Sequence, residues 1–113
     1  MKTSLATLAV ILSLMLATAS RAEVFSARQS WDELCAKCHG ANGEGKTKIG
    51  VKMRIKDYTA AKVQAEFSDV GLLKDLLLGV SGDKEAERMP AYKDKMTVAE
   101  AKELVALIRS FKK

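Results

Sequence analysis

The sequence predicts an all-α domain of about four short helices around a single core. Apolar residues recur at helical spacing in four segments, two of these segments begin with a capping-box sequence, and no strand pattern is visible. A length of 113 residues fits one domain. The composition, 48% hydrophobic and 29% charged, excludes a disordered chain and a membrane bundle.

The first 22 residues have the layout of a secretory signal peptide. Lys2 precedes an apolar run over residues 5–19, and the small residues Ser20 and Ala22 favour cleavage after Ala22. The segment Ala17-Thr18-Ala19 offers a second, less favoured site. A retained membrane anchor is the alternative, but about 15 apolar residues are fewer than the roughly 20 that span a bilayer. We therefore expect an exported, periplasmic protein whose mature domain is residues 23–113.

The mature domain has a mild positive charge. Removing residues 1–22 leaves 17 basic and 14 acidic residues, a net charge of +3. Basic and acidic residues are interspersed, so the charge does not indicate a nucleic-acid-binding protein.

The first half of the mature chain predicts two helices separated by a loop. The capping box that starts at Ser26 predicts a first helix of about 12 residues. Glycine-rich sequence between residues 40 and 50 predicts a loop. A short second helix is expected over residues 59–67.

The second half predicts two clearer helices. The third helix is capped by Ser68 or Asp69 and ends at Gly79. The last helix starts at the capping box of residues 97–100, and its apolar stripe continues to Phe111.

The only two cysteines, Cys35 and Cys38, stand beside the only histidine, His39. Two thiols about one helical turn apart can each add to a vinyl group of a porphyrin. The imidazole that follows immediately can then ligate the iron from the proximal side. This spacing predicts one covalently attached haem c per chain, with His39 as an axial ligand.

Three other chemistries are open to the same residues. A disulfide at this spacing closes a tiny loop and constrains little of the unfolded chain. A thioredoxin-type redox site belongs to alternating strands and helices, which this sequence lacks. A structural zinc site normally has four ligands, and only three cysteine or histidine residues are present. The haem prediction is favoured over all three.

A second axial ligand has to come from another residue type, because the chain has one histidine. Met89 precedes the only proline, Pro90, which fixes its own φ and keeps Met89 out of helical conformation. A stiffened loop there could hold the Met89 thioether over the iron. Met96 is the main rival, followed by Met53, and an iron without a sixth ligand is the remaining alternative.

Together these features resemble the class I cytochromes c, in their short, exported bacterial form. In that family the matching cysteines attach haem, and the matching histidine and the methionine before proline bind iron. The resemblance therefore implies a cytochrome c fold around one haem, with Cys35, Cys38, His39 and Met89 binding the cofactor and the last two binding the metal. It also implies that the first and last helices cross. The matching features are Trp31, Cys35 to Gly40, Gly43, Gly45, the helix ending at Gly79, Met89-Pro90-Ala91-Tyr92, and Leu104 to Ser110.

Two positions depart from the family pattern. No proline follows the attachment motif, so the acceptor of the His39 Nδ1 proton is unassigned. In the last helix, Leu107 stands where an aromatic residue is common, and Trp31 is large enough to compensate.

An iron with both axial positions filled has no place for a substrate. The predicted function is therefore one-electron transfer between redox protein partners, by a monomer that is not an enzyme and has no membrane span after signal removal. A haem peroxidase or a ligand-binding sensor with an open or labile distal site is the alternative, although no histidine remains there for acid–base work. Lysines that flank the predicted crevice in sequence either steer an acidic partner or form an ordinary solvated surface. These are Lys46, Lys48, Lys52, Lys93 and Lys95.

Overall fold

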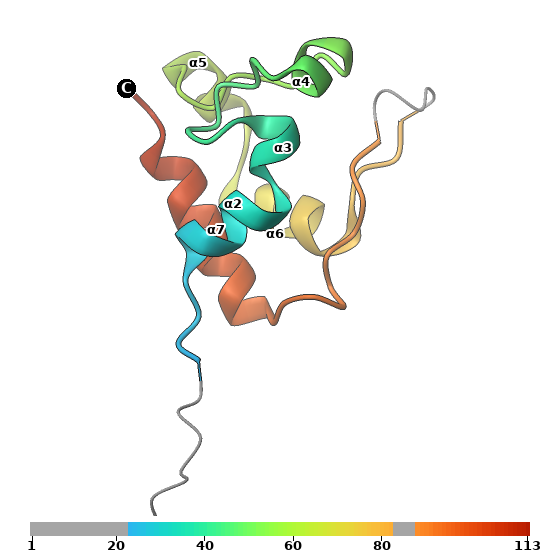
Figure 1. Ribbon diagram of the computed structural model, residues 1–113. Helices are drawn as coiled ribbons and strands as arrows, with labels where there is room; N and C mark the ends of the chain where they lie inside the picture. Colours follow the sequence, from blue (N-terminus) through green and yellow to red (C-terminus); the bar gives the residue numbers. More distant parts are fainter. Residues whose placement is uncertain (1–22, 83–87) are drawn as a thin grey trace, which may run out of the picture.

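The computed structural model describes residues 23–82 and 88–113, so the predicted signal peptide lies outside the described residues. The described part is all-α, as predicted: its only β-type pairing is a single antiparallel bridge between Val80 and Met89. No helix in this part is long and apolar enough to cross a membrane. The helices, shown in Figure 1, are α2 (Ala27–Leu34), α3 (Ala36–His39), α4 (Lys48–Lys52), α5 (Ala61–Glu66), α6 (Asp69–Leu78) and α7 (Val98–Ser110).

The predicted first helix is divided in two at Cys35. Ser26 caps α2, and its side chain accepts a hydrogen bond from the Gln29 amide at 3.2 Å. Cys35 then departs from helical geometry, with φ −118° and ψ −38°, and α3 continues to His39. The expectation of one continuous 12-residue helix is therefore wrong at this residue. The division places Cys35 at the break and Cys38 within α3.

The glycine-rich segment is a loop only as far as Thr47. The Thr47 hydroxyl accepts a hydrogen bond from the Gly50 amide at 2.8 Å and so caps α4, a helix that the glycine content concealed. The same hydroxyl donates to the Cys38 carbonyl at 2.6 Å and ties α4 to α3. A Cβ on Gly50 would lie 2.7 Å from the Cys38 carbonyl oxygen, so the close approach of α4 to α3 requires glycine.

Helix α5 begins at Ala61, two residues later than expected. The amide and hydroxyl of Thr59 both donate to the Asp57 carboxylate, at 2.8 and 2.6 Å. This local turn engages the backbone before the helix can start.

The boundaries of α6 and α7 agree with the prediction. Ser68 caps α6, and Gly79 ends it at φ 74°. Thr97 and Glu100 form the predicted capping box at the start of α7.

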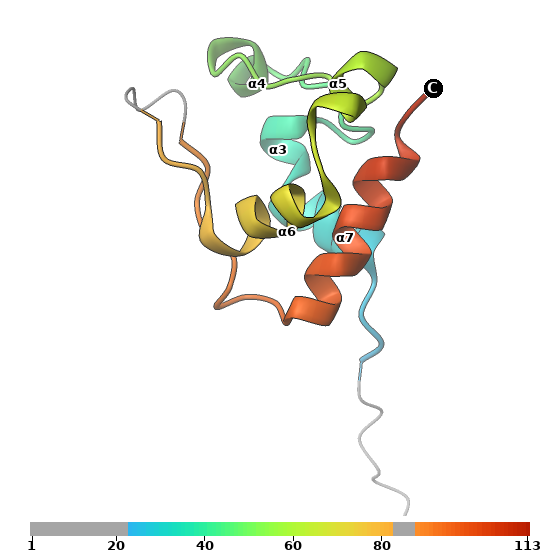
Figure 2. The same ribbon diagram turned by 180° about the vertical axis from the view of Figure 1, so that it is seen from behind.

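The core lies where α7 packs against α2 and α6, as seen from both sides in Figures 1 and 2. This contact joins the first and last helices, as the resemblance implied. Trp31 is 1% exposed and Leu104 is fully buried at its centre. The other buried apolar residues are Cys35, Leu72, Leu76, Met96, Ala101, Val105 and Ile108.

The aromatic partner of Trp31 is Phe111, at the end of α7. The two ring centroids are 5.0 Å apart, with an interplanar angle of 58°. Leu107, the position where the resemblance led us to look for an aromatic side chain, is half-buried beside the core. The helix crossing therefore keeps an aromatic contact, supplied one turn further along the chain.

A buried polar network joins α5 to α7. Gln64 is 6% exposed, and its side-chain amide donates to the carbonyls of Tyr58 at 2.8 Å and Ile108 at 2.9 Å. The Arg109 guanidinium donates to the side-chain oxygen of Gln64 at 2.8 Å and to the Phe67 carbonyl at 2.6 Å. Because each buried group has a partner, the network fixes the segment that carries Tyr58.

Candidate functional site

A cavity of about 370 Å³ is bounded by α3, by residues 53–58, by α6 and by the segment that leads into Pro90. Cys35, Cys38, His39 and Met89, the four predicted cofactor residues, all line it. The fold thus gathers side chains that lie far apart in the sequence around one space.

The other two candidate methionines lie in different places. Met96 is 8% exposed and belongs to the hydrophobic core, outside the residues that line the cavity. Met53 follows α4 and does line the cavity. Met53 is therefore the structural rival of Met89.

The His39 imidazole is held between aromatic rings. The Tyr58 ring stacks on it, with centroids 5.5 Å apart and an interplanar angle of 14°, and the Trp31 ring lies 5.6 Å away. Burial lowers the pKa of His39. The imidazole is therefore held in its neutral form, the form that ligates metals.

The Nδ1 atom of His39 is buried and has no hydrogen-bond partner among the described residues. The neighbouring carbonyls are already engaged. The Gly40 carbonyl accepts from the Trp31 indole at 2.9 Å, and the Cys38 carbonyl accepts from the Thr47 hydroxyl. The acceptor that the sequence left unassigned is also not found here.

The two thiols differ in their surroundings. Cys35 is 5% exposed and Cys38 is half-buried. Burial, with a smaller contribution from the neighbouring Cys38, raises the pKa of Cys35 to about 11. A thiol–disulfide oxidoreductase requires a lowered pKa at its attacking cysteine, so this environment disfavours that chemistry.

Met89 belongs to a segment that is hydrogen-bonded to the end of α6. Met89 and Val80 exchange backbone hydrogen bonds of 2.9 and 3.0 Å, and the Tyr92 amide donates to the Leu76 carbonyl at 3.0 Å. A Cβ on Gly79 would lie 2.5 Å from the Met89 carbonyl oxygen, so only glycine permits this approach. Met89 is half-buried, held by backbone contacts on both sides of Pro90.

Three basic residues that the sequence analysis missed line the cavity: Arg54, Lys56 and Arg88. Arg54 has φ 53°, a left-handed conformation that is uncommon outside glycine. No local pattern marks these residues, because the path of the chain after α4 decides where they lie.

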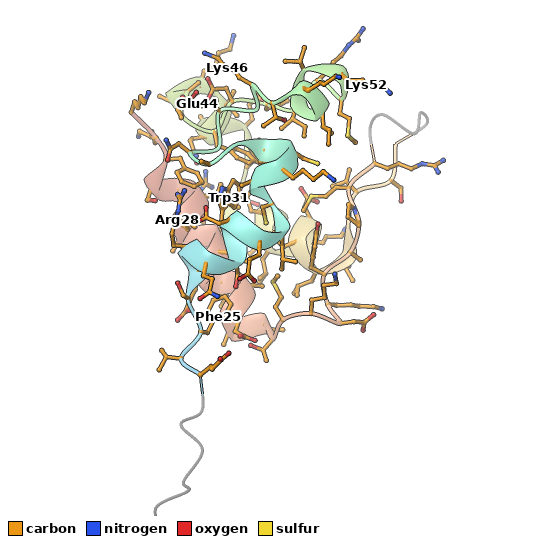
Figure 3. The ribbon with its side chains drawn as sticks, in the orientation of Figure 1. Phe25, Arg28, Trp31, Glu44, Lys46 and Lys52 are labelled. Carbon is orange, nitrogen blue, oxygen red and sulfur yellow. The ribbon has the colours of Figure 1, made fainter. Side chains whose placement is uncertain are left out.

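The five lysines singled out from the sequence are all exposed, and none lines the cavity. Figure 3 shows Lys46 and Lys52 pointing outward at the same end of the molecule, whereas Trp31 lies inside it. The five lysines therefore belong to the solvated surface and not to the cavity lining.

The residues around the cavity fit a covalently bound haem. Two thiols and a neutral imidazole come from one stretch of chain, and a thioether comes from another. Apolar side chains such as Leu34, Ile55 and Phe67 suit a flat hydrophobic macrocycle, and the basic residues suit its carboxylates.

The sequence matches a family model described as cytochrome c over residues 26–112. The chain belongs to the cytochrome c family. The solved structure of the KustC0563 c-type cytochrome is 28% identical, with a TM-score of 0.65, over 79% of this chain and 100% of that chain. A mutant of that cytochrome is 27% identical, with a TM-score of 0.62, over 78% of this chain and 100% of that chain. The comparison with curated proteins finds no match.

Family membership confirms the cytochrome c fold and gives the class of function. A c-type cytochrome is an electron carrier, it works with redox partners, and members of the family are typically not enzymes. The Cys35 and Cys38 pair of this cytochrome is consistent with covalent haem.

Proposed function

We propose that this cytochrome carries single electrons between redox proteins, with haem c attached through Cys35 and Cys38 and iron held by His39 and Met89. The observation that supports this proposal is that all four side chains line one cavity. When bound, the haem supplies reversible one-electron chemistry at its iron. The protein supplies the ligands, their orientation and the surrounding charge.

The walls of the cavity perform the orienting role. Tyr58 and Trp31 restrict the His39 ring from two sides, and the hydrogen bonds to Val80 and α6 restrict Met89. A thioether ligand favours reduced iron relative to a second nitrogen ligand, and an apolar wall disfavours the extra ferric charge. These residues therefore favour a moderately positive reduction potential.

Two groups of basic residues have separate roles in this proposal. Arg54 and Arg88 line the cavity, where they can pair with the haem carboxylates, whereas Lys56, which also lines it, is already paired with Glu66. The exposed lysines can attract an acidic redox partner and raise its association rate. These are Lys46, Lys48, Lys52, Lys93 and Lys95. The second role predicts an association rate that falls as ionic strength rises.

The absorption spectrum of the purified haem protein tests the ligand assignment. We expect low-spin, six-coordinate haem with the methionine-to-ferric charge-transfer band. Met89→Ala should abolish this band, and the matched variants Met53→Ala and Met96→Ala should keep it. Survival of the band in Met89→Ala would exclude Met89 as the ligand. High-spin haem in the unmodified protein would instead favour the peroxidase or sensor alternative.

Intact-mass measurement tests the covalent attachment. The mature protein should carry the mass of one haem, and acid–acetone extraction should not remove it. Cys35→Ser and Cys38→Ser should each leave at most one thioether bond. A mature protein with the mass of bare polypeptide, produced in a host that attaches haem to other cytochromes, would refute the attachment.

We also propose that residues 1–22 direct export to the periplasm and are then removed. The support is the charged, apolar and small-residue layout of this segment. N-terminal sequencing of the mature protein should give Glu23 as the first residue. Recovery of the uncleaved chain from the cytoplasmic fraction would contradict export.

A further inference from the structure

Asp75 is the single acidic side chain among the described residues that line the cavity. It lies on α6 one turn before Gly79, whose amide donates to the Asp75 carbonyl at 2.9 Å. It also lines a smaller cavity that touches both His39 and Met89. Asp75 therefore lines the same cavities as Met89 and His39.

The carboxylate of Asp75 has no visible role in holding the fold. The side chain is half-buried, and the ion pairs and side-chain hydrogen bonds found in residues 23–82 and 88–113 do not include it. The other acidic residue of α6 behaves differently: Asp69 pairs with Arg109 at 2.7 Å. The Asp75 carboxylate is therefore not committed to an ion pair and is free to act on the cavity that it lines.

Asp75 and His39 line the same two cavities. Burial raises the pKa of Asp75, and the adjacent Lys74 opposes this effect. Tyr58, whose ring stacks on His39, lines the same two cavities as Asp75. Electrostatic interactions are stronger in a poorly solvated cavity than in water.

We propose that Asp75 tunes the redox equilibrium of this cytochrome by placing a negative charge beside the cavity that holds the cofactor. The oxidised iron carries one more positive charge than the reduced iron, so a nearby carboxylate favours the oxidised form and lowers the reduction potential. It opposes the effect of the thioether and of the apolar wall, and of the basic residues Arg54, Lys56 and Arg88. The inference rests on the function proposed above.

Potentiometric titration of the haem-loaded protein, followed by absorbance at pH 8, tests this role. Asp75→Asn should increase the ratio of reduced to oxidised protein about tenfold at a fixed ambient potential, which is a rise of about 59 mV for one electron. Asp75→Glu, which keeps the charge, should remain close to the unmodified protein. Glu103→Gln is the matched control, because it removes one negative charge from an exposed position on α7, and its ratio should not change.

The spectra of the same samples separate a change of charge from a change of ligand. Asp75→Asn and a second neutral variant, Asp75→Ser, should keep the methionine band. An unchanged potential in a neutral variant with this band would overturn the role of Asp75 and leave electron carriage intact. Loss of haem from both neutral variants, but not from Asp75→Glu, would overturn it in favour of a structural role. Absence of low-spin haem from the unmodified protein would instead overturn the proposed function itself.

Discussion

The Trp31 indole donates a 2.9 Å hydrogen bond to the carbonyl of Gly40, so one buried side chain spans the whole attachment motif. Trp31 precedes this motif by four residues, and Gly40 closes it, with φ 85°. The bond holds the two ends of the cysteine–histidine segment together.

We expect Trp31→Phe to destabilise the protein by about 2 kcal/mol. The substitution leaves the Gly40 carbonyl without its donor and removes part of a ring that is 1% exposed. Guanidinium unfolding followed by circular dichroism measures the change in the free energy of unfolding. Lys102→Ala, on the exposed face of α7, is the control and should change stability by no more than about 0.5 kcal/mol.

Gly43→Ala should destabilise the protein by roughly 2–3 kcal/mol. Gly43 has φ 74°, and an added Cβ would lie 2.7 Å from Cδ2 of Phe111. The variant therefore pays for a left-handed conformation and for displacing the aromatic partner of Trp31. Gly71→Ala in α6 is the comparison: its backbone is helical, and the nearest atom to an added Cβ is the Ser68 side-chain oxygen, at 3.0 Å. The gain in helix propensity and this close contact oppose each other, so stability should change by no more than about 1 kcal/mol. Equal effects at the two positions in thermal unfolding would contradict the predicted contact.

Gln64→Leu should cost about 2 kcal/mol, although leucine has a similar size. The Tyr58 carbonyl loses its donor, and the Ile108 carbonyl keeps only the Phe111 amide. The Arg109 guanidinium loses its acceptor on the Gln64 side chain. Urea unfolding checks this value. Gln29→Leu on the exposed surface of α2 is the matched substitution and should be close to neutral, because its amide contacts only the exposed Glu33.

Asp57→Asn should lower stability at pH 7 by about 1 kcal/mol or less, because solvent screens the interactions of this accessible carboxylate, and the difference should disappear in acid. The Thr59 side chain, followed by the Thr59 amide, lowers the pKa of Asp57 in the folded protein through hydrogen bonds to its carboxylate. The folded protein therefore binds this proton less tightly than the unfolded chain, whose pKa is about 3.9. The stabilisation is complete above this value and is lost as pH falls through the folded-state pKa.

Thermal unfolding of the unmodified protein and Asp57→Asn at pH 7 and in a series of acidic buffers measures this dependence. A constant difference in stability across the series would contradict it. Asp94→Asn, at an exposed position, controls for the change in net charge.

The cysteine–histidine motif and the Met89-Pro90 pair could be predicted from the sequence, because each depends only on residues that are neighbours in the chain. The spacing of Cys35, Cys38 and His39 needs no tertiary information, and Pro90 restricts its neighbour Met89 through covalent geometry alone. The structure brings Cys35, Cys38, His39 and Met89 to one cavity, while their bonds to the cofactor stay a prediction.

The charged lining of the cavity could not be predicted in the same way. Arg54 and Asp75 reach the cavity because α4 is capped by Thr47, because Arg54 turns the chain, and because α6 presents one face inward. Each of these depends on packing between distant segments. The glycines between residues 40 and 50 also concealed α4. Gly50 is needed because α4 lies close to the Cys38 carbonyl, and not because the segment is flexible.

The backbone bonds between α6 and the methionine segment have a consequence for how the protein opens. Val80, Met89 and Tyr92 donate their amides across this contact, so none of the three can exchange hydrogen for deuterium until it separates. We expect their amides to share one opening free energy with the last turn of α6, as a single cooperative unit. Met89 would then leave its position only when the end of that helix unfolds with it.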